Sequence, residues 1–396
     1  MNLQNKKPIK VAIVHDWLTG MRGGERCLQS FLKIYPEADI FTLVHIAGST
    51  TPEIDARVKQ VSFLGKIPGI AKWYKLFLPL FPLAIRGFNF KGYDLIISLS
   101  HAAAKNIHPP RGTLHICYCF TPIRYVWDQA RQYLGLLFYL AYPLIIFLRW
   151  WDRRGAARVT HFVAISRFVA ARIRLYYGRK AAVIRPAIAD FWLDDLELSR
   201  DVSLDIPAGD FFLAAGALVA YKKFDLAIDA FLKSGKKLLI AGDGPEMSRL
   251  KKRASVGNNI YFLGRVNDSQ LRFLYRSCVA LIFPGVEDFG LIPIECLATG
   301  SPVVAYGRGG VAESLKLSGT PQEIYLSSKL RVLKLPVGML FGGGDDMARV
   351  EALILTIDYM AANKESFSKI EAGNFARNFA EKRFFSEWQK FIGFYI

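Results

Sequence analysis

The stretch Lys10-Val-Ala-Ile-Val-His-Asp16 leads through the glycine-rich residues 20–24 into a helical pattern that starts at Glu25. A short β-branched run that ends at Val14, a glycine turn and a helix are typical of the first unit of an α/β sheet. Similar strand-like runs, separated by intervals long enough for crossover helices, occupy residues 39–44, 94–98, 115–119 and 161–165. This alternation predicts a parallel, doubly wound sheet in the first half of the chain.

The same alternation restarts in the second half of the 396-residue chain. Strand-like runs, each followed by glycine or proline and a helical pattern, occupy residues 211–215, 237–241, 260–263, 280–283 and 303–305. Residues 186–209 are acidic and irregular, which indicates a boundary between domains. We therefore predict two doubly wound, parallel-sheet α/β domains at 1–188 and 210–377, a linker at 189–209, and a C-terminal helix at 378–396 that reaches back to the first domain.

The charge of the chain is unevenly distributed. The sequence has 52 Lys and Arg against 34 Asp and Glu, a formal net charge of +18. Residues 1–190 hold 27 basic and 10 acidic side chains, whereas residues 191–396 hold 25 and 24. With 52% apolar residues, the chain is not a disordered basic tail. The excess positive charge predicts an anionic partner for the first domain, either nucleic acid or a membrane surface.

Two segments of the first half favour the membrane surface. Residues 57–93 contain seven Lys or Arg, no Asp or Glu and eight aromatic side chains, and residues 132–148 are 17 uncharged residues flanked by Arg131 and Arg149. Basic groups and aromatic rings together suit the boundary of an anionic lipid bilayer. We expect residues 132–148 to form a helix that is buried or inserted in the interface, since the run is short for a complete span. No nucleic-acid-binding motif is present, so we predict no nucleic acid partner.

The compartment follows from cysteines and the N-terminal region. The five cysteines have no metal-ligand spacing, which suggests buried thiols in a reducing compartment. The apolar run Val11–Val14 is too short for a secretory signal. We expect a cytoplasmic protein, peripheral on the inner face of the plasma membrane.

The strongest functional signal is Pro284-Gly-Val-Glu-Asp-Phe-Gly-Leu-Ile-Pro-Ile-Glu295. Glu287 follows a predicted strand, Phe289-Gly290-Leu291 opens a helix with exposed N–H groups, and Glu295 lies about two turns further on. The N–H groups of such a helix face phosphate, and a nearby carboxylate can accept hydrogen bonds from sugar hydroxyls. This pattern indicates a nucleotide-sugar site.

The chain resembles the retaining glycosyltransferases of family 4, which have the two-domain GT-B fold. Glu287 and Glu295 match the Glu-x7-Glu motif of that family. The resemblance implies that Glu287 contacts the donor sugar, that Glu295 binds the ribose hydroxyls, and that Lys222 binds the donor pyrophosphate. Segments that contain Gly242 and Arg265 match family segments near the base, and Arg265 is a further candidate for binding the pyrophosphate.

In the first domain, three segments resemble a subgroup that includes mannosyltransferases of bacterial surface-polysaccharide assembly: residues 23–25, 98–101 and 118–125. We assign catalytic roles to Glu287, His101 and Asp16, although His15 and Asp16 can also be a purely structural pair. The acceptor and phosphate loop is assigned to Gly23, Gly24, Glu25, Phe120 and Arg124.

Two positions depart from the family pattern. Many relatives have arginine where this chain has Ala217, and many have histidine where this chain has Phe120. A phenyl ring cannot donate a hydrogen bond to a hydroxyl. Three explanations remain open: the donor is a 6-deoxyhexose, His101 makes the sugar contact, or Phe120 is an ordinary core residue.

The expected activity is transfer of a hexose, with GDP-mannose as the first candidate donor, to a lipid-linked glycan in the synthesis of a bacterial surface polysaccharide. We expect no cofactor and no essential metal, because no DxD motif stands at a strand end and Lys222, helix N-termini and Arg265 can neutralise the pyrophosphate. The resemblance implies same-face attack, in which the leaving phosphate accepts the proton. The alternatives are a catalytically weak, membrane-bound scaffold, or a transferase that uses a 6-deoxyhexose or UDP-sugar donor.

Overall fold

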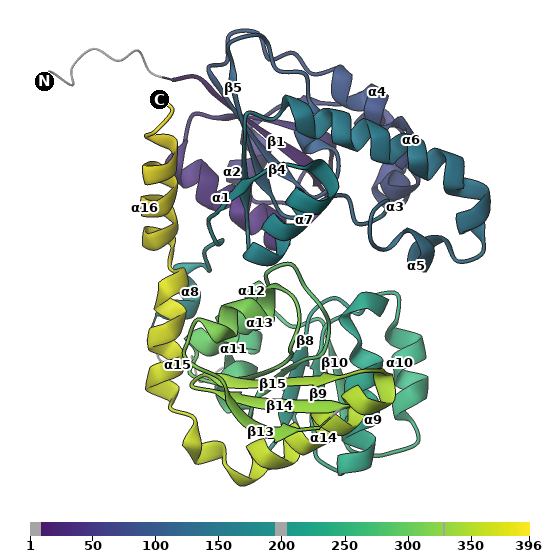
Figure 1. Ribbon diagram of the computed structural model, residues 1–396, viewed down its shortest axis with the longest axis vertical. Helices are drawn as coiled ribbons and strands as arrows, with labels where there is room; N and C mark the ends of the chain where they lie inside the picture. The colour runs from purple at the N-terminus through teal and green to yellow at the C-terminus, as the bar shows by residue number, and fades with distance from the viewer. Residues whose placement is uncertain (1–8, 195–203, 328) are drawn as a thin grey trace, which may run out of the picture. The chain divides into compact units, whose positions relative to one another are not determined.

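The computed structural model describes residues 9–194, 204–327 and 329–396 (Figure 1). The chain forms two compact units: unit 1 comprises residues 1–186 and 387–396, and unit 2 comprises residues 187–386. Each unit is built around one β-sheet. The predicted linker at 189–209 falls in unit 2, and its residues 195–203 lie outside the described part of the chain.

The sheet of unit 1 is entirely parallel over its described residues. In spatial order its strands are β3 (Val58–Val61), β2 (Asp39–His45), β1 (Val11–Leu18), β4 (Leu95–Ser100), β5 (Leu114–Cys119), β6 (His161–Ala164) and β7 (Ala181–Val183). The parallel sheet of the first domain is thus confirmed, with β3 and β7 as strands that the sequence pattern did not predict.

Helices cover both faces of this sheet (Figure 1). They are α1 (Gly23–Ile34), α2 (Pro52–Ala56), α3 (Ile70–Trp73), α4 (Phe81–Arg86), α5 (Ala130–Leu134), α6 (Leu137–Arg158) and α7 (Arg167–Tyr177), with the 3₁₀ turns η1 (Phe63–Lys66), η2 (Tyr74–Leu80) and η3 (Ala104–Asn106). Ser166 begins α7 as predicted, because its hydroxyl accepts a hydrogen bond from Val169 N at 3.1 Å. The end of α16 (Glu381–Ile392) also packs on unit 1, where Trp388 Nε1 donates to Tyr35 Oη at 2.9 Å.

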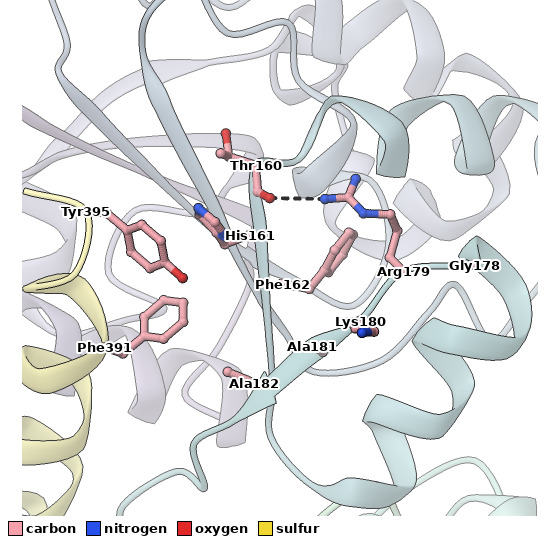
Figure 2. A pocket seen from close by; sticks show the side chains of 10 residues that line it. All are labelled: Thr160, His161, Phe162, Gly178, Arg179, Lys180, Ala181, Ala182, Phe391 and Tyr395. Carbon is pink, nitrogen blue, oxygen red and sulfur yellow. Dashed lines mark hydrogen bonds between the residues drawn. The ribbon is translucent and has the colours of Figure 1, made fainter.

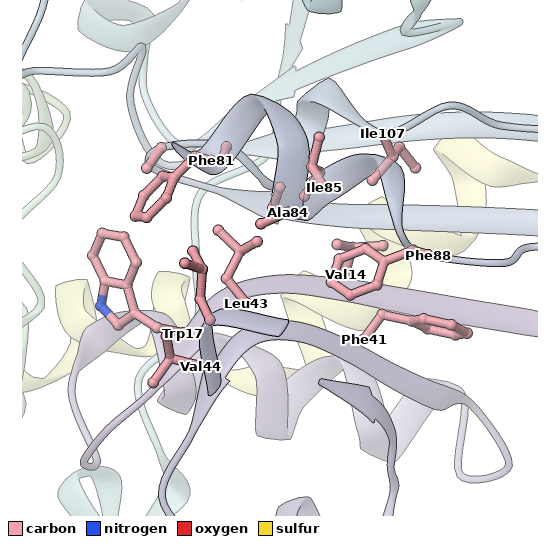
Figure 3. Packing of buried hydrophobic residues seen from close by; sticks show 14 of the residues in the cluster. Val14, Trp17, Phe41, Leu43, Val44, Phe81, Ala84, Ile85, Phe88 and Ile107 are labelled. Atoms are coloured by element: carbon pink, nitrogen blue, oxygen red, sulfur yellow. The ribbon is translucent and has the colours of Figure 1, made fainter. Parts of the chain in front are cut away.

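One large apolar core of unit 1 joins the sheet with helices α3, α4 and α6. Trp17 and Val14 of β1 and Phe41 of β2 pack with Phe81 and Ile85 of α4 (Figure 3). Ile145, Leu148 and Trp151 of α6 belong to the same cluster. The two segments singled out for their basic and aromatic character, 57–93 and 132–148, are therefore anchored on one shared core.

The predicted helix at 132–148 is divided in two. Gly135 takes a positive φ of 53° between α5 and α6, and α6 then continues to Arg158. One face of α6 is buried in the core, whereas Leu137, Leu140 and Phe147 are exposed. Across residues 9–194, 204–327 and 329–396, none of the helices combines the length and the apolar character that a membrane crossing requires.

The sheet of unit 2 is mixed. Its order is β10 (Ile260–Gly264), β9 (Leu238–Ala241), β8 (Phe212–Ala215), β11 (Leu281–Phe283), β12 (Val303–Tyr306), β15 (Gly338–Gly343), β14 (Leu330–Leu335) and β13 (Gln322–Leu326). The five predicted strands are present and parallel, but β14 runs antiparallel to both β13 and β15. The predicted parallel strands are confirmed, and the antiparallel pairing of β14 is an addition that the sequence pattern did not predict, because a tight turn after β14 returns the chain directly to β15 without a crossover helix.

The helices of unit 2 surround this sheet. They are α8 (Asp190–Leu193), α9 (Phe224–Ser234), α10 (Met247–Ala254), α11 (Asp268–Ser277), α12 (Leu291–Ala298), α13 (Gly310–Lys316), α14 (Asp346–Ala362) and α15 (Lys369–Ala376), with η4 (Ala220–Lys222), η5 (Lys364–Ser366) and η6 (Arg377–Phe379). Apolar residues of α9 and α14, such as Phe231 and Leu353, fill the core against the strands.

Strand β1 is longer than predicted and contains His15 and Asp16. Trp17 and Leu18 continue the ladder with Val44 and His45 of β2. The carboxylate of Asp16 is fully buried, yet it accepts four backbone hydrogen bonds, from the N–H groups of His101, Ala102, Ala103 and Ala104, at 2.6–2.8 Å. These four donors and the 3.1 Å approach of His101 Nδ1 satisfy the carboxylate, so Asp16 can be buried within the strand.

A second buried carboxylate, Asp152 of α6, holds the residues that follow the same loop. Its oxygens accept from Lys105 Nζ, from Trp127 Nε1 at 2.8 Å and from Tyr177 Oη at 2.7 Å. The side chains of Lys105 and Asp152 have no exposed area. Because each carboxylate oxygen has partners, the buried ion pair is complete, and it fixes α6 to the loop that carries His101.

Asp16→Asn is expected to lower the free energy of unfolding by about 3 kcal/mol, because the amide NH₂ opposes N–H groups that the carboxylate accepted. Burial by itself raises the pKa of Asp16, but His101 and the backbone donors outweigh it and hold the pKa below its ordinary value of 3.8. A lowered folded-state pKa stabilises the fold above pH ~4, and this stabilisation is lost as the pH falls through the folded pKa. Urea denaturation should therefore show a gap between wild type and variant that is full at pH 7 and narrows in acid; a gap independent of pH would contradict this.

Candidate active site

The predicted donor residues of unit 2 gather at the C-terminal ends of its parallel strands. Lys222 follows β8 through η4, and Glu287 follows β11, the strand next to β8. Lys222 Nζ lies 3.1 Å from Glu287 Oε1, and the two side chains are 11% and 18% exposed. The structure thus joins two residues that are 65 positions apart into a half-buried ion pair at the edge where α/β sheets bind ligands.

Glycines make this close packing possible. A Cβ at Gly216 would lie 2.7 Å from Lys222 Nζ, and Gly216 has a positive φ of 128°. A Cβ at Gly242 would lie 1.9 Å from the carbonyl oxygen of Gly216. Only residues without side chains allow these two strand ends and the lysine to approach so closely.

Helix α12 begins beside the ion pair. Gly290 precedes it with a φ of 90°, and Leu291 is its first residue. Phe289 is buried and packs against Phe379 at 5.8 Å between ring centroids, so its side chain belongs to the core. Glu295 is buried on the same helix. The predicted contribution of residues 289–291 is therefore limited to backbone N–H groups and positioning.

Arg265 is not brought to the ion pair. It follows the edge strand β10, is 88% exposed, and has its Nε 4.0 Å from Asp243 Oδ2. Two strands, β9 and β8, separate β10 from β11 in the sheet order. The structure therefore gives no support to Arg265 as a partner of Lys222 in binding the pyrophosphate, although both residues follow the C-terminal ends of strands.

In unit 1 the predicted residues gather at the C-terminal edge of the sheet. His15, Leu99 and Tyr118 are in register across β1, β4 and β5. His101 follows Leu99 by two residues, and Phe120 follows Tyr118 by two residues. The ring centroids of His15, His101 and Phe120 are 6.1–6.4 Å apart. Trp17 packs edge-on against His101 at 4.3 Å. We call His15, His101 and Phe120 the ring cluster.

The predicted catalytic role of Asp16 does not fit its surroundings. Its carboxylate is fully buried, and backbone donors already occupy both oxygens. A carboxylate in this state positions the loop of His101 and has no access to a substrate. Asp16 is thus a positioning residue, whereas His101 keeps a partly exposed side chain at the edge.

The glycine loop starts helix α1. Gly23 and Gly24 are its first two residues, and Glu25 Oε2 accepts from the backbone N–H of Arg22 at 3.1 Å. Glu25 is buried, which identifies it as a residue that stabilises the helix start. Arg124 is partly buried in the turn after β5, where its carbonyl oxygen accepts from the N–H groups of Asp128 and Gln129.

The sequence pattern predicted no site role for Gly216, Lys105 or Asp152, and it left His15 open as half of a strand-end pair with Asp16. Gly216 was visible only as the residue before Ala217. Lys105 and Asp152 are 47 positions apart and carry no motif. Among the described residues, no cluster of His, Cys, Asp and Glu is arranged to hold a metal ion.

A cavity of about 500 Å³ lies elsewhere in unit 1, beside the starts of β6 and β7. His161 stacks on Tyr395 at its wall, and Arg179 donates to the carbonyl oxygen of Thr160 (Figure 2). Arg179 also donates to the carbonyl oxygens of Ala156 and Val159. These bonds satisfy carbonyl groups at the C-terminal end of α6 and just after it, so Arg179 has a structural role. Because the cavity is at the N-terminal edge of the sheet and contains no predicted site residue, it is not the candidate active site.

The chain is similar to known glycosyltransferases, and the family model that it matches falls within unit 2. Residues 199–320 match the family model described as "Glycosyl transferases group 1". The D-rhamnosyltransferase WbpZ of Pseudomonas aeruginosa is 30% identical over 114 residues, 28% of this chain and 30% of that protein. The O-antigen chain mannosyltransferase C of Escherichia coli is 29% identical over 101 residues, 24% of this chain and 27% of that protein. The chain spans between 30% and 40% of the length of the first curated relatives that it matches.

Solved structures extend the likeness to the whole fold. The structure of Anabaena HepE in complex with UDP and glucose has a TM-score of 0.67 with this chain, at 17% identity, and the match covers 98% of this chain and all of that one. The predicted fold is therefore confirmed: the two sheets and their helices form the two α/β domains of a GT-B glycosyltransferase fold. Within that fold, residues 199–320 are the part that matches the family model of group 1 glycosyl transferases.

Proposed function

We propose that this chain is a retaining glycosyltransferase that moves a hexose from a nucleotide-diphosphate sugar to a hydroxyl of a lipid-linked glycan. The observation that carries the proposal is the pair of Lys222 and Glu287 beside the start of α12. This pair lies within residues 199–320, which match the group 1 family model. A cation, a carboxylate and backbone N–H groups together suit the phosphate and sugar parts of one donor.

Each group has a definite part in the proposed reaction. The Lys222 ammonium neutralises the charge that develops on the leaving pyrophosphate, with the backbone N–H groups at the start of α12 beside it. Glu287 accepts hydrogen bonds from hydroxyls of the donor sugar, and Glu295 serves the ribose. The leaving phosphate takes the proton of the attacking hydroxyl, so retention needs no protein nucleophile and no metal ion in this scheme.

Glu287→Ala is expected to lower the rate of sugar transfer by about 100-fold or more while the protein stays folded, since a preorganised polar contact to the reacting sugar is lost. Transfer from a radiolabelled donor measures the rate, and circular dichroism checks the fold. Glu323→Ala is the matched control, because Glu323 lies on the distant strand β13 and its carboxylate forms an exposed ion pair with Arg331 of β14. Full activity of Glu287→Ala would refute the site.

The donor sugar is proposed to be mannose, carried by GDP. The E. coli relative is named as a mannosyltransferase. A 6-deoxyhexose is the second candidate, because Phe120 replaces a hydrogen-bonding side chain in the ring cluster and the P. aeruginosa relative is named as a rhamnosyltransferase.

A panel of GDP-mannose, GDP-6-deoxyhexoses and UDP-glucose should give the highest kcat/KM with GDP-mannose. Phe120→His is expected to favour mannose further over 6-deoxy donors, because the imidazole can bond to the additional hydroxyl. If the ratio of the two kcat/KM values is unchanged in this variant, Phe120 does not contact the sugar and the 6-deoxyhexose candidate loses its support.

We further propose that unit 1 docks on anionic lipid at the cytoplasmic face of the membrane. Large apolar side chains on segments that share one core are exposed, among them Trp73, Leu76, Leu83, Leu136, Leu137, Leu140, Phe147 and Trp150. Lys66, Arg86, Arg131 and Arg154 are exposed on the same segments. Exposed apolar side chains that alternate along the chain with cations suit the headgroup boundary, where a lipid-linked acceptor would be presented.

Binding to vesicles that contain phosphatidylglycerol should fall strongly in the double variant Leu136→Glu/Leu140→Glu, whose two sites are 88% and 81% exposed. Each added carboxylate must leave water next to anionic lipid, which weakens both apolar and electrostatic attraction. Sedimentation with vesicles at two salt concentrations measures the effect. Val256→Glu, at an 82% exposed site of unit 2, is the control. Retention of the protein by polynucleotide but not by vesicles would overturn the membrane proposal.

A further inference from the structure

His15 is a buried histidine with one nitrogen that has no partner. His15 lies on β1, an inner strand of the sheet, and is 1% exposed. Nδ1 lies 2.9 Å from the carbonyl oxygen of Trp17. A carbonyl only accepts, so Nδ1 carries the proton and Nε2 of the neutral ring presents a lone pair. Within the described structure, Nε2 has no hydrogen-bond partner.

The lone pair points toward Gly24 and Phe120. A Cβ added at Gly24 would lie 3.2 Å from His15 Nε2 and 3.5 Å from Phe120 Cε2. Gly24 and Phe120 are both partly exposed, so they separate the nitrogen from the surface at the C-terminal edge of the sheet. Nε2 is itself buried, and because Gly24 has no side chain, the cover on this side consists of the Gly24 backbone and the Phe120 ring.

The chemistry of this place selects the ligand atom. A neutral imidazole nitrogen with a lone pair repels a phosphate oxygen and attracts a hydroxyl hydrogen. Burial lowers the pKa of His15 below its ordinary value of 6.5, with His101 adding to the effect, and it outweighs Glu25 and Asp16, which raise the pKa, so the ring stays neutral. The adjacent phenyl ring of Phe120 offers an apolar surface of the kind that the C–H face of a sugar packs on.

We infer that His15 Nε2 accepts a hydrogen bond from a sugar hydroxyl bound over Gly24 and Phe120. This inference rests on the proposed function, which brings two sugars to the protein, that of the donor and that of the acceptor. The polar contact with the sugar that Phe120 cannot make is thus assigned to His15. His101 has a different role, since its Nδ1 is directed at Asp16.

Three variants separate a ligand contact from a structural role. His15→Asn retains an N–H in the place of Nδ1 for the Trp17 carbonyl but removes the acceptor at Nε2. His15→Gln places an amide oxygen within reach of the Nε2 position. Gly24→Ala is compatible with the second position of α1, where alanine favours the helix, yet its Cβ adds to the cover over Nε2.

His115→Asn is the matched control. His115 is also fully buried and also has one nitrogen without a partner, but its Nε2 is bonded to Ser98 Oγ at 2.9 Å and it stands in the first half of β5. His115→Asn thus also removes a buried imidazole, but from a position that is not at the C-terminal ends of the strands. Thermal unfolding midpoints verify that each variant is folded, and Gly24→Ala carries the test if His15→Asn does not fold.

The expected result is a drop of about 3- to 10-fold in kcat/KM for transfer in His15→Asn and Gly24→Ala, the loss typical of one neutral hydrogen bond. His15→Gln should retain most of the wild-type value, and His115→Asn all of it. If the hydroxyl belongs to the acceptor, acceptor KM rises while hydrolysis of the donor without acceptor is unchanged. If it belongs to the donor sugar, hydrolysis of the donor falls by the same factor as transfer.

Two results would overturn the inference in distinguishable ways. Wild-type transfer with unchanged kinetics in folded His15→Asn and Gly24→Ala would show that Nε2 has no sugar partner, while the proposed function stands. No transfer and no hydrolysis by the wild-type protein with any nucleotide sugar would refute the proposed function, and the sugar ligand of His15 with it.

Discussion

The arrangement of unit 1 depends on the buried carboxylate of Asp16. A charge without solvent is strongly unfavourable unless hydrogen bonds surround it, and here four consecutive backbone N–H groups of residues 101–104 converge on its two oxygens. The carboxylate thereby fixes the loop after β4 against β1. These hydrogen bonds hold the loop where the ring of His101 lies 6.1–6.2 Å from the rings of His15 and Phe120.

The same loop is held from its other end by a second buried carboxylate. Lys105 and Asn106 both donate to Asp152 of α6, so the loop runs from the β1 carboxylate to the α6 carboxylate. The outer face of α6 carries exposed apolar side chains, among them Leu140 and Phe147. A helix that is proposed to meet lipid is therefore connected through one ion pair to the loop that positions His101.

Local rules accounted for much of the fold, and long-range partners account for what was missed. The cap at Ser166 and the five parallel strands of unit 2 were predictable, because hydroxyl caps and apolar runs are readable within a few residues. The extension of β1 through His15 and Asp16 was not, since the donors that permit burial lie 85 or more positions away. The hairpin of β13 and β14 was missed because β13 is mostly exposed and lacks a continuous apolar run.

For the candidate site, the motif residues were recognisable from a family resemblance. The unpartnered nitrogen of His15, by contrast, follows only from the packing around Gly24.

The uneven charge of the sequence has a physical explanation in the two units. Unit 2, which is nearly neutral over most of its length, presents a lysine, a carboxylate and a helix start at one edge, and short-range contacts of this kind bind an anionic donor without a large net charge. The cations of unit 1 are instead spread along segments with exposed apolar side chains. A dispersed positive charge discriminates poorly between small ligands but adds up over a surface of many anionic headgroups. The net charge of +18 is thus better matched to the proposed lipid surface than to the nucleotide sugar.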